Sequence, residues 1–390
     1  MTLTHRPEAG TVVDGLRRRA ADLVPVLEQR AMQAEGARRI PDETIDDLKK
    51  AGFLRIATPE RFGGNGCDYN VSFEVAMELG RGCGSTAWCY SVWASHNWML
   101  GQWPLAAQEE YFADGPDTFA SSSFIPAGRL EAVDGGYRLS GRWEFSSGSD
   151  ASAWVLLGAI GERGPVMAVV PRSDYEIVDT WFVSGLRGTG SNDIVLDDAF
   201  VPAYRVGPFP FAPPDGRGEG WHLHHRPSYR IPAPSLLPWT LAAPLVGIAQ
   251  GALDKFVEHA RGGTAPGRRA DSVGLQLRIA ESSAEVDAAR LIVRQDAAEV
   301  VERGRTGEEL SEGDVARFRR DHCFVAKLAV QAVNRLFEGS GGHALFDADP
   351  IQRQHRDVHA GSHQIALLWD TSAQAYGRHV LGLPPEPGVL

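Results

Sequence analysis

The sequence Trp143-Glu144-Phe145-Ser146-Ser147-Gly148 closes a strand-like run in the middle of a chain of 390 residues. Its aromatic residues are followed directly by two hydroxyl side chains and by a glycine, which lacks a Cβ and permits the close approach of another group. This order suits contact between hydroxyl groups and a flat polar ring that an aromatic side chain shields from water. Because Ser-Ser-Gly after a strand is also typical of an ordinary turn, the neighbouring motifs decide the interpretation.

A second informative segment lies downstream of the first. It reads Gly185-Leu-Arg-Gly-Thr-Gly-Ser-Asn-Asp-Ile-Val-Leu-Asp-Asp-Ala-Phe-Val-Pro202. Further on are the helix-like run Leu245-Val-Gly-Ile-Ala-Gln-Gly-Ala-Leu253 and the residues Arg353, Arg356 and Asp357. In order and spacing, these segments resemble the acyl-CoA dehydrogenase superfamily over nearly the whole chain.

The hydrophobic periodicity predicts an α+β chain, and the resemblance implies that its fold is acyl-CoA dehydrogenase-like. Apolar residues at helical spacing favour an all-helical N-terminal domain over residues 1–115. Short runs of strand-forming residues, separated by glycine-rich turns, predict an antiparallel β domain over 116–206. A Pro/Gly-rich loop at 207–234 precedes four long helical segments at 235–390, which predict a four-helix bundle.

Composition limits the class of protein and its surroundings. An apolar content of 43% and a charged content of 23% are those of a soluble globular protein. The net charge of −11 argues against a nucleic-acid partner, which would need basic patches. The four cysteines show no Cys-x-x-Cys spacing, and no apolar run reaches the ~18 residues that span a bilayer. We therefore expect a cytoplasmic protein without a membrane partner.

Two other kinds of site have weak support in the sequence. The glycines at 80, 82 and 84 lie between two helices, so they lack the strand-to-helix context of a nicotinamide site. His355, His359 and His363 follow one another at helical spacing, but the His-Glu-x-x-His pattern of a zinc site is missing and Gly361 interrupts the run. We therefore expect no metal.

The dehydrogenase reaction requires a carboxylate base, and the resemblance places that base at one of two positions. The first position aligns with Gln364-Ile365 and the second with Trp239-Thr240. Neither contains a carboxylate, so α,β-dehydrogenation lacks the group that removes the proton.

The chain instead resembles the flavin-dependent monooxygenase branch of this superfamily, the oxygenase components of two-component phenol hydroxylases. The resemblance implies O2 as co-substrate, a C4a-hydroperoxyflavin and three catalytic residues. In these enzymes a serine contacts flavin N5, a histidine faces flavin C4a and another histidine faces the aromatic substrate, which correspond here to Ser146, His363 and His96. Ser147 competes with Ser146 for the N5 contact. Trp143, Phe145, Ser146, Ser147, Gly341 and Gly342 are the expected cofactor-binding residues.

The resemblance implies that reduced flavin comes from a separate NAD(P)H:flavin reductase, with FADH2 favoured over FMNH2. It also implies a homotetramer and a phenolic or indolic substrate. Three alternatives remain open: an N-oxygenase acting on an amino sugar or amine, an acyl-CoA dehydrogenase or oxidase with a displaced base, and a non-catalytic binding protein of the same fold.

Overall fold

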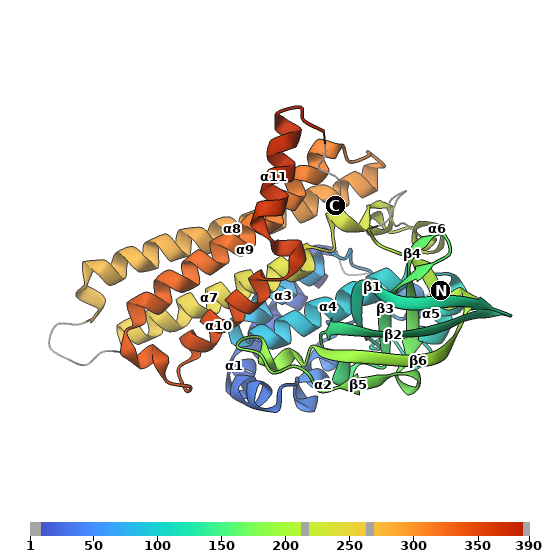
Figure 1. Ribbon diagram of the computed structural model, residues 1–390. Coiled ribbons are helices and arrows are strands. Elements are labelled where there is room, and N and C mark those ends of the chain that lie inside the picture. The colour runs from blue at the N-terminus through green and yellow to red at the C-terminus, as the bar shows by residue number, and fades with distance from the viewer. Residues whose placement is uncertain (1–8, 212–217, 263–268, 385–390) are drawn as a thin grey trace, which may run out of the picture.

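The computed structural model describes residues 9–211, 218–262 and 269–384. Helices make up its N-terminal part: α1 (Ala9–Ala37), α2 (Asp42–Lys50), α3 (Val71–Gly82), α4 (Gly84–Leu100) and α5 (Leu105–Tyr111). Every residue of α4 is buried, which is typical of a helix at the centre of a large protein. α4 lies between the sheet and the C-terminal helices (Figure 1) and contacts α3, α7 and β1. α4 is therefore placed to contribute side chains to both halves of the molecule.

The middle of the chain forms one seven-stranded sheet in the order β5-β6-β2-β1-β3-β4-β7. The strands are β1 (Ala120–Val133), β2 (Gly136–Ser146), β3 (Trp154–Gly161), β4 (Gly164–Pro171), β5 (Glu176–Val178), β6 (Asn192–Pro202) and β7 (Val206–Pro208). The prediction of a wholly antiparallel sheet was wrong in one respect: β1 pairs with β3 in parallel. The turns that join β1 to β2 and β3 to β4 leave local signals in the sequence. The short link at 147–153 instead carries the chain from β2 to the other side of β1, which no local pattern indicates.

The C-terminal helices are α7 (Trp239–Arg261), α8 (Val273–Thr306), α9 (Glu312–Ser340), α10 (Pro350–Ser362) and α11 (Trp369–Val380). α7, α8, α9 and α10 pack together as the bundle, while α11 packs on α9 and projects from it (Figure 1). The Pro/Gly-rich stretch before the bundle is less irregular than expected, because it contains α6 (Gly220–His224) and two short 3-10 turns. Residues 212–217 of this stretch lie outside the described residues.

The stretch Ala233–Arg261 is long and apolar enough to cross a membrane, and it alone meets that test among the described residues. Of its most apolar window, 89% is buried inside the fold. It contains α7, which packs against α3, α4, α8, α9 and α10. Its apolar character is therefore explained by its place at the centre of the bundle.

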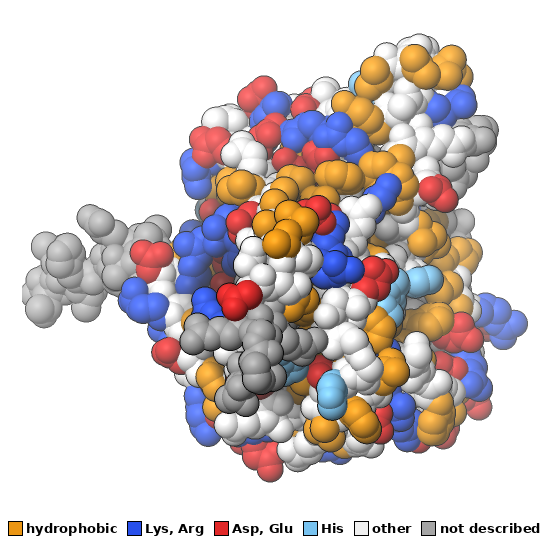
Figure 2. Space-filling model, turned by 90° about the vertical axis from the view of Figure 1, so that its left-hand side faces the viewer, with side chains coloured by type: hydrophobic (Ala, Val, Ile, Leu, Met, Phe, Trp, Pro, Cys, Tyr) orange, Lys and Arg blue, Asp and Glu red, His pale blue; other side chains and the backbone are white. Residues whose placement is uncertain are grey.

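Hydrophobic side chains gather in a band across the upper part of the face that the bundle presents in Figure 2. Exposed large hydrophobic residues of the C-terminal region are Val273, Leu277, Leu291, Leu345, Phe346, Ile365, Leu368, Val380, Leu381 and Leu383. Large contiguous apolar patches on a protein surface usually mark sites of association.

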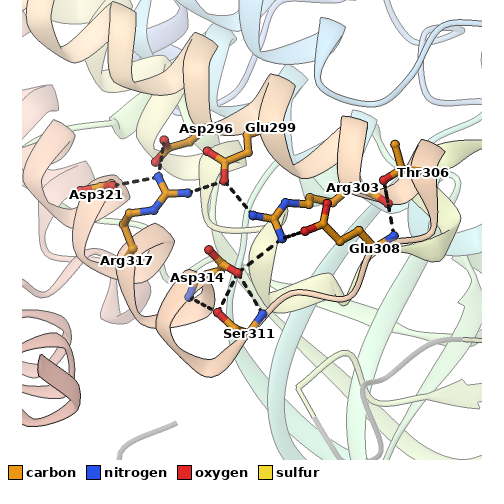
Figure 3. A network of polar contacts seen from close by, with 9 residues as sticks. All are labelled: Asp296, Glu299, Arg303, Thr306, Glu308, Ser311, Asp314, Arg317 and Asp321. Atoms are coloured by element: carbon orange, nitrogen blue, oxygen red, sulfur yellow. Dashed lines mark hydrogen bonds and ion pairs between the residues drawn. The ribbon is translucent and has the colours of Figure 1, made fainter. Parts of the chain in front are cut away.

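A polar network joins α8 to α9 (Figure 3). Arg317 of α9 donates to Asp296 at 3.0 Å and to Glu299 at 2.8 Å, and both acceptors belong to α8. Asp321, one turn along α9, lies 3.8 Å from the same guanidinium. Asp296 Oδ2 is buried and has no hydrogen-bond partner among the described residues. Burial and the neighbouring Asp321 carboxylate raise the pKa of Asp296 to about 7.

Candidate functional site

The end of β2 carries the serine pair at a backbone kink. Phe145 has a left-handed φ of 64°, and the pairing with β6 shifts register between Trp143 and Ser146. Such irregularities re-aim the side chains that follow and concentrate near active sites. As a result, the Phe145 ring is 59% exposed and lies edge-on to Trp181, with centroids 6.1 Å apart.

The two serines differ in their hydrogen bonding. Ser147 Oγ accepts from Trp88 Nε1 at 3.3 Å and lies 2.7 Å from Ser191 Oγ. Ser191 Oγ is in turn 2.7 Å from Thr189 Oγ1, which donates to the carbonyl of Leu186 at 2.8 Å. Ser147 is therefore fixed within a chain of protein hydrogen bonds.

Ser146, in contrast, has an unused hydroxyl. Its side chain is fully buried, and its Oγ has no hydrogen-bond partner in the part of the chain that the structure describes. A buried polar atom without a partner is costly, so such an atom at a kinked strand end is a candidate for contact with a ligand. This difference favours Ser146 over Ser147 as the residue with a free hydroxyl.

His96 lies on the face of α4 that packs against β1. Its Nδ1 lies 2.6 Å from the carbonyl oxygen of Ala120. A carbonyl can only accept, so Nδ1 carries the proton and Nε2 keeps a free lone pair. Burial lowers the pKa of His96 to about 4, so the imidazole is neutral at physiological pH. His96 is therefore a hydrogen-bond acceptor in an apolar setting, with Phe124 edge-on at 6.1 Å.

His363 directly follows α10 and precedes α11. Its side chain is exposed, and Nδ1 lies 2.7 Å from the carbonyl oxygen of His359. The end of α10 packs against residues close to the serine pair. Gly361 lies so close to them that an added Cβ would be 3.0 Å from the Trp88 side chain and 3.5 Å from the Leu186 side chain. Because Trp88 also donates to Ser147, the structure brings the ends of α10 and β2 into one neighbourhood.

The other two histidines of this run face the bundle. The His355 ring stacks on Phe337 with centroids 4.3 Å apart, and His359 Nε2 lies 2.8 Å from Asn334 Oδ1. Within residues 9–211, 218–262 and 269–384, no group of three or more His, Cys, Asp or Glu side chains could hold a metal ion.

Arg356 and Asp357 hold the loop of the second motif against α10. The buried Asp357 carboxylate accepts from the Leu186 backbone N–H at 2.6 Å, and Arg356 donates to the carbonyl of Ser184 at 2.7 Å. Burial raises the pKa of Asp357 to about 6. The loop at 184–186 and the helix that carries His363 are thus held together, which gives the Arg-Asp motif a structural role.

Three of the expected cofactor-binding residues lie away from this neighbourhood. The Trp143 side chain is fully buried in the core of the sheet and donates to the carbonyl of Gly158 at 2.7 Å, so we assign it to packing. Gly341 and Gly342 follow the end of α9, and α9 runs away from the sheet into the bundle (Figure 1). Within one chain, these glycines are not brought together with Ser146.

Both positions for a dehydrogenase base hold side chains that serve the fold. The Gln364 side chain accepts from the Ala366 backbone N–H at 2.6 Å. The Thr240 hydroxyl is hydrogen-bonded to the Tyr69 hydroxyl, and the Trp239 side chain is fully buried. Neither position offers a carboxylate, as the sequence predicts.

Sequence reasoning missed Trp88, Thr189 and Ser191 as members of the site. Trp88 is buried as a core residue would be, but its indole N–H donates to Ser147. Thr189 and Ser191 lie within the second motif that was quoted for the fold. The sequence does contain a signal for these residues. Trp88 follows the glycine- and serine-rich start of a helix, and Thr189 and Ser191 are hydroxyl residues within the second motif.

Comparison with known proteins identifies the family of this chain. Residues 8–112 match the family "Acyl-CoA dehydrogenase, N-terminal domain", and residues 239–367 match "Acyl-CoA dehydrogenase, C-terminal domain". The oxygenase subunit HsaA of a flavin-dependent monooxygenase from Mycobacterium tuberculosis is 38% identical over 93% of this chain and 94% of that protein. Its crystal structure has a TM-score of 0.90 at 36% identity, covering 97% of this chain and 100% of that chain.

Two further proteins extend the comparison. The oxygenase component of an FADH(2)-dependent resorcinol hydroxylase from Rhizobium sp. is 36% identical over 98% of both chains. The structure of XiaF from Streptomyces sp., in complex with FADH2 and glycerol, has a TM-score of 0.89 at 28% identity and covers 98% of this chain and 99% of that one. The chain therefore belongs to the acyl-CoA dehydrogenase superfamily, in its branch of flavin-dependent monooxygenases that serve as oxygenase components.

Proposed function

We propose that this oxygenase hydroxylates a phenolic or indolic small molecule with O2 and reduced flavin, and that Ser146, His96 and His363 are its catalytic residues. The observation that carries the proposal is the contrast between Ser147, whose hydroxyl is fixed by Trp88 and Ser191, and Ser146, whose buried hydroxyl has no partner among the described residues. The resorcinol hydroxylase supports an aromatic substrate, and the resorcinol hydroxylase and XiaF together support FADH2 in preference to FMNH2.

The residues at the end of β2 fit a flavin. Ser146 offers a free hydroxyl, Phe145 offers an exposed aromatic face, and the loop at 184–186 is held close by Asp357. When bound, reduced flavin would activate O2 and supply the oxygen atom. In this assignment the Ser146 hydroxyl accepts a hydrogen bond from an N–H at the edge of the ring and holds that proton in place. The apolar surroundings exclude water, which would otherwise release hydrogen peroxide.

The two histidines have different tasks in this proposal. His96 is neutral with a free Nε2, so it can accept the proton of a phenolic hydroxyl and raise the electron density of the ring. His363 lies at the end of α10 with Nδ1 bound to the carbonyl of His359, which leaves Nε2 available to hold or deliver a proton beside the flavin.

Two partners belong to the proposal. A separate NAD(P)H:flavin reductase would supply the reduced flavin, and this is supported by the relatives, which are oxygenase subunits or components. A homotetramer would cover the exposed apolar side chains of α8 and α11 (Figure 2), and it could bring Gly341 and Gly342 of one chain to the flavin of another.

The test compares Ser146→Ala with its neighbour Ser147→Ala. Both variants are supplied with reduced flavin by a generic reductase, and product and hydrogen peroxide are measured for each O2 consumed. A neutral hydrogen bond contributes about 0.5–1.5 kcal/mol, so we expect Ser146→Ala to raise the ratio of peroxide to product by roughly threefold to tenfold. If Ser147→Ala uncouples the reaction and Ser146→Ala does not, the roles of the two serines are reversed.

A further inference from the structure

A chain of hydrogen bonds runs from α4 through the end of β2 into the loop between β5 and β6. It begins at Trp88 Nε1, which lies 3.3 Å from Ser147 Oγ. The hydroxyl oxygens of Ser147, Ser191 and Thr189 follow at 2.7 Å for each step. Thr189 Oγ1 then donates to the Leu186 carbonyl at 2.8 Å. This hydroxyl chain therefore joins three segments that are far apart in the sequence.

The two ends of the hydroxyl chain fix the direction of every bond in it. An indole N–H can only donate, and a carbonyl oxygen can only accept. Each hydroxyl between them therefore accepts from its neighbour on the Trp88 side and donates toward Leu186. Hydrogen bonds that point the same way polarise one another, so a change at one end alters the bonds along the whole chain.

Asp357 extends the chain into α10. Its Oδ1 accepts from the Leu186 N–H at 2.6 Å, and Leu186 has a left-handed φ of 50°, which a bulky residue keeps only where its surroundings fix it. Asp357 Oδ2 lies beside the start of α4, where an added Cβ on Gly84 would be 3.0 Å away. One carboxylate therefore contacts both the loop and the helix that carries Trp88.

Packing at the end of α10 closes these contacts into a circuit that passes beside two proposed catalytic residues. Gly361, one turn after the aspartate, lies against the Trp88 and Leu186 side chains. On β2 the circuit includes the residue that directly follows Ser146, and on α10 it ends two residues before His363. The positions of Ser146 and His363 relative to each other therefore depend on this circuit.

The Asp357 carboxylate can change its charge within the circuit. Charged and titratable groups face it from α10, from α1 and from the residue before α4: Arg353, Arg356, Glu35 and Cys83. Burial, opposed by the Leu186 N–H and the two arginines, raises the pKa of Asp357 to about 6. Because the Leu186 N–H acts to lower this pKa, its bond is stronger to the ionised carboxylate than to the acid. The bond therefore weakens as the pH falls through about 6.

We propose that Asp357 is a positioning residue of the oxygenase reaction, which acts through Leu186 and the hydroxyl chain to hold Ser146 in place relative to the end of α10. The inference rests on the proposed role of Ser146 beside the flavin. A bond to the protonated acid is roughly half as strong as one to the carboxylate. Protonation therefore loosens the serine pair, and more of the O2 leaves as hydrogen peroxide instead of entering the product.

The first measurement needs no flavin. Hydrogen exchange of the Leu186 amide is followed by mass spectrometry with single-residue fragmentation at pH 5 and pH 8, relative to an unstructured peptide at the same pH. Asp357→Asn keeps the shape of the protonated acid and cannot ionise. At pH 8 the amide should exchange roughly fivefold to twentyfold faster in Asp357→Asn than in wild type, whereas at pH 5 the two rates should be nearly equal.

The second measurement follows turnover at the same two pH values, with reduced flavin from a generic reductase. The ratio of peroxide to product should be roughly threefold to tenfold higher in Asp357→Asn than in wild type at pH 8, and the same in both at pH 5. A merely structural role would make the two proteins differ equally at both pH values, so their convergence at pH 5 is the readout that identifies positioning by the charge.

Two further variants complete the design. Asp349→Asn makes the same substitution on the same helix, at a cap that accepts from the Ile351 N–H at 2.8 Å outside the circuit. Asparagine caps a helix as well as aspartate does, so this control should behave like wild type. Thr189→Val removes the hydroxyl that donates to Leu186 without changing a charge, so it should raise the peroxide ratio at both pH values alike.

The proposal is overturned if the Leu186 amide exchanges equally in wild type and Asp357→Asn at pH 8, or if exchange changes without the peroxide ratio. Differences of equal size at pH 5 and pH 8, or an unchanged ratio in Thr189→Val, would overturn it as well. Failure of the proposed function is recognised separately, in wild type that forms no hydroxylated product or in Ser146→Ala with the wild-type ratio, and either result would overturn both proposals.

Discussion

Replacing Asp296 by Asn should stabilise the protein above neutral pH. Asp296 and Asp321 share one guanidinium, that of Arg317, between α8 and α9 (Figure 3). The side chains of the two aspartates are 5% and 10% exposed, so little water screens their repulsion when both are ionised. Asn has the shape of a protonated Asp and cannot ionise, so it removes this repulsion while an oxygen remains for Arg317.

The sign of the effect follows from the pKa. In the folded chain the pKa of Asp296 is raised from 3.8 to about 7, so the folded state binds this proton more tightly than the unfolded state. The resulting stability is fully present below pH 3.8 and is lost as the pH rises through about 7. At about 1.4 kcal/mol per pH unit, the whole window corresponds to roughly 4 kcal/mol, and the attraction of Arg317 for the ionised form is already contained in the pKa of about 7.

The assay is chemical denaturation of wild type and Asp296→Asn at several pH values between 5 and 8. We expect the free energy of unfolding of the wild type to fall over this range and that of the variant to stay flatter. Asp321→Asn should behave like Asp296→Asn, since it removes the other carboxylate of the pair and so abolishes the same repulsion. Glu299→Gln is the matched control: it removes another carboxylate bound to Arg317 at 2.8 Å and should not stabilise the protein at pH 8. Parallel pH profiles for wild type and Asp296→Asn would refute the reasoning.

Two further predictions concern the histidines of the proposed site. His363→Ala should lower the hydroxylation rate by about 10²–10⁴-fold while the thermal unfolding midpoint stays near that of wild type, because the side chain is exposed; an unchanged rate would remove His363 from the mechanism. His96→Phe keeps a ring in the core but lacks the Nε2 acceptor, so it should slow turnover of weakly acidic phenols by a factor in the same range. Phenols that are already ionised at the assay pH should lose much less, and an equal loss for both classes would indicate a packing role instead.

The fold could be predicted from the sequence because its elements leave local signals. The helical spacing of apolar residues and the glycine-rich turns indicated a helical start, a central sheet and a terminal bundle. The parallel pairing of Ser121 with Val155 could not be predicted, because strand partners that are distant in sequence are chosen by packing and not by a turn. The short helix α6 within the Pro/Gly-rich stretch was missed for a similar reason, since its neighbours hold it.

The candidate site was predictable at the level of motifs but not of single atoms. Ser146 and Ser147 are equivalent in the sequence, and the structure distinguishes them through Trp88 and Ser191, which come from segments far away in the chain. The orientation of the Trp143 side chain could not be predicted either. A strand residue next to the motif can face either side of the sheet, and Trp143 faces the core. Gly341 and Gly342 follow the end of α9, away from Ser146, and their contact with the flavin stays a prediction.

The central claim is tested most directly by turnover under ¹⁸O2 with a generic flavin reductase, NADH, FAD and a panel of phenols and indoles. Mass spectrometry should show one ¹⁸O atom in the product, because one atom of O2 enters the aromatic ring and the other leaves as water. The same protein without reductase should neither oxidise NADH nor form product. A product that lacks ¹⁸O, or anaerobic bleaching of the bound oxidised flavin by an acyl-CoA, would contradict the assignment as an aromatic monooxygenase.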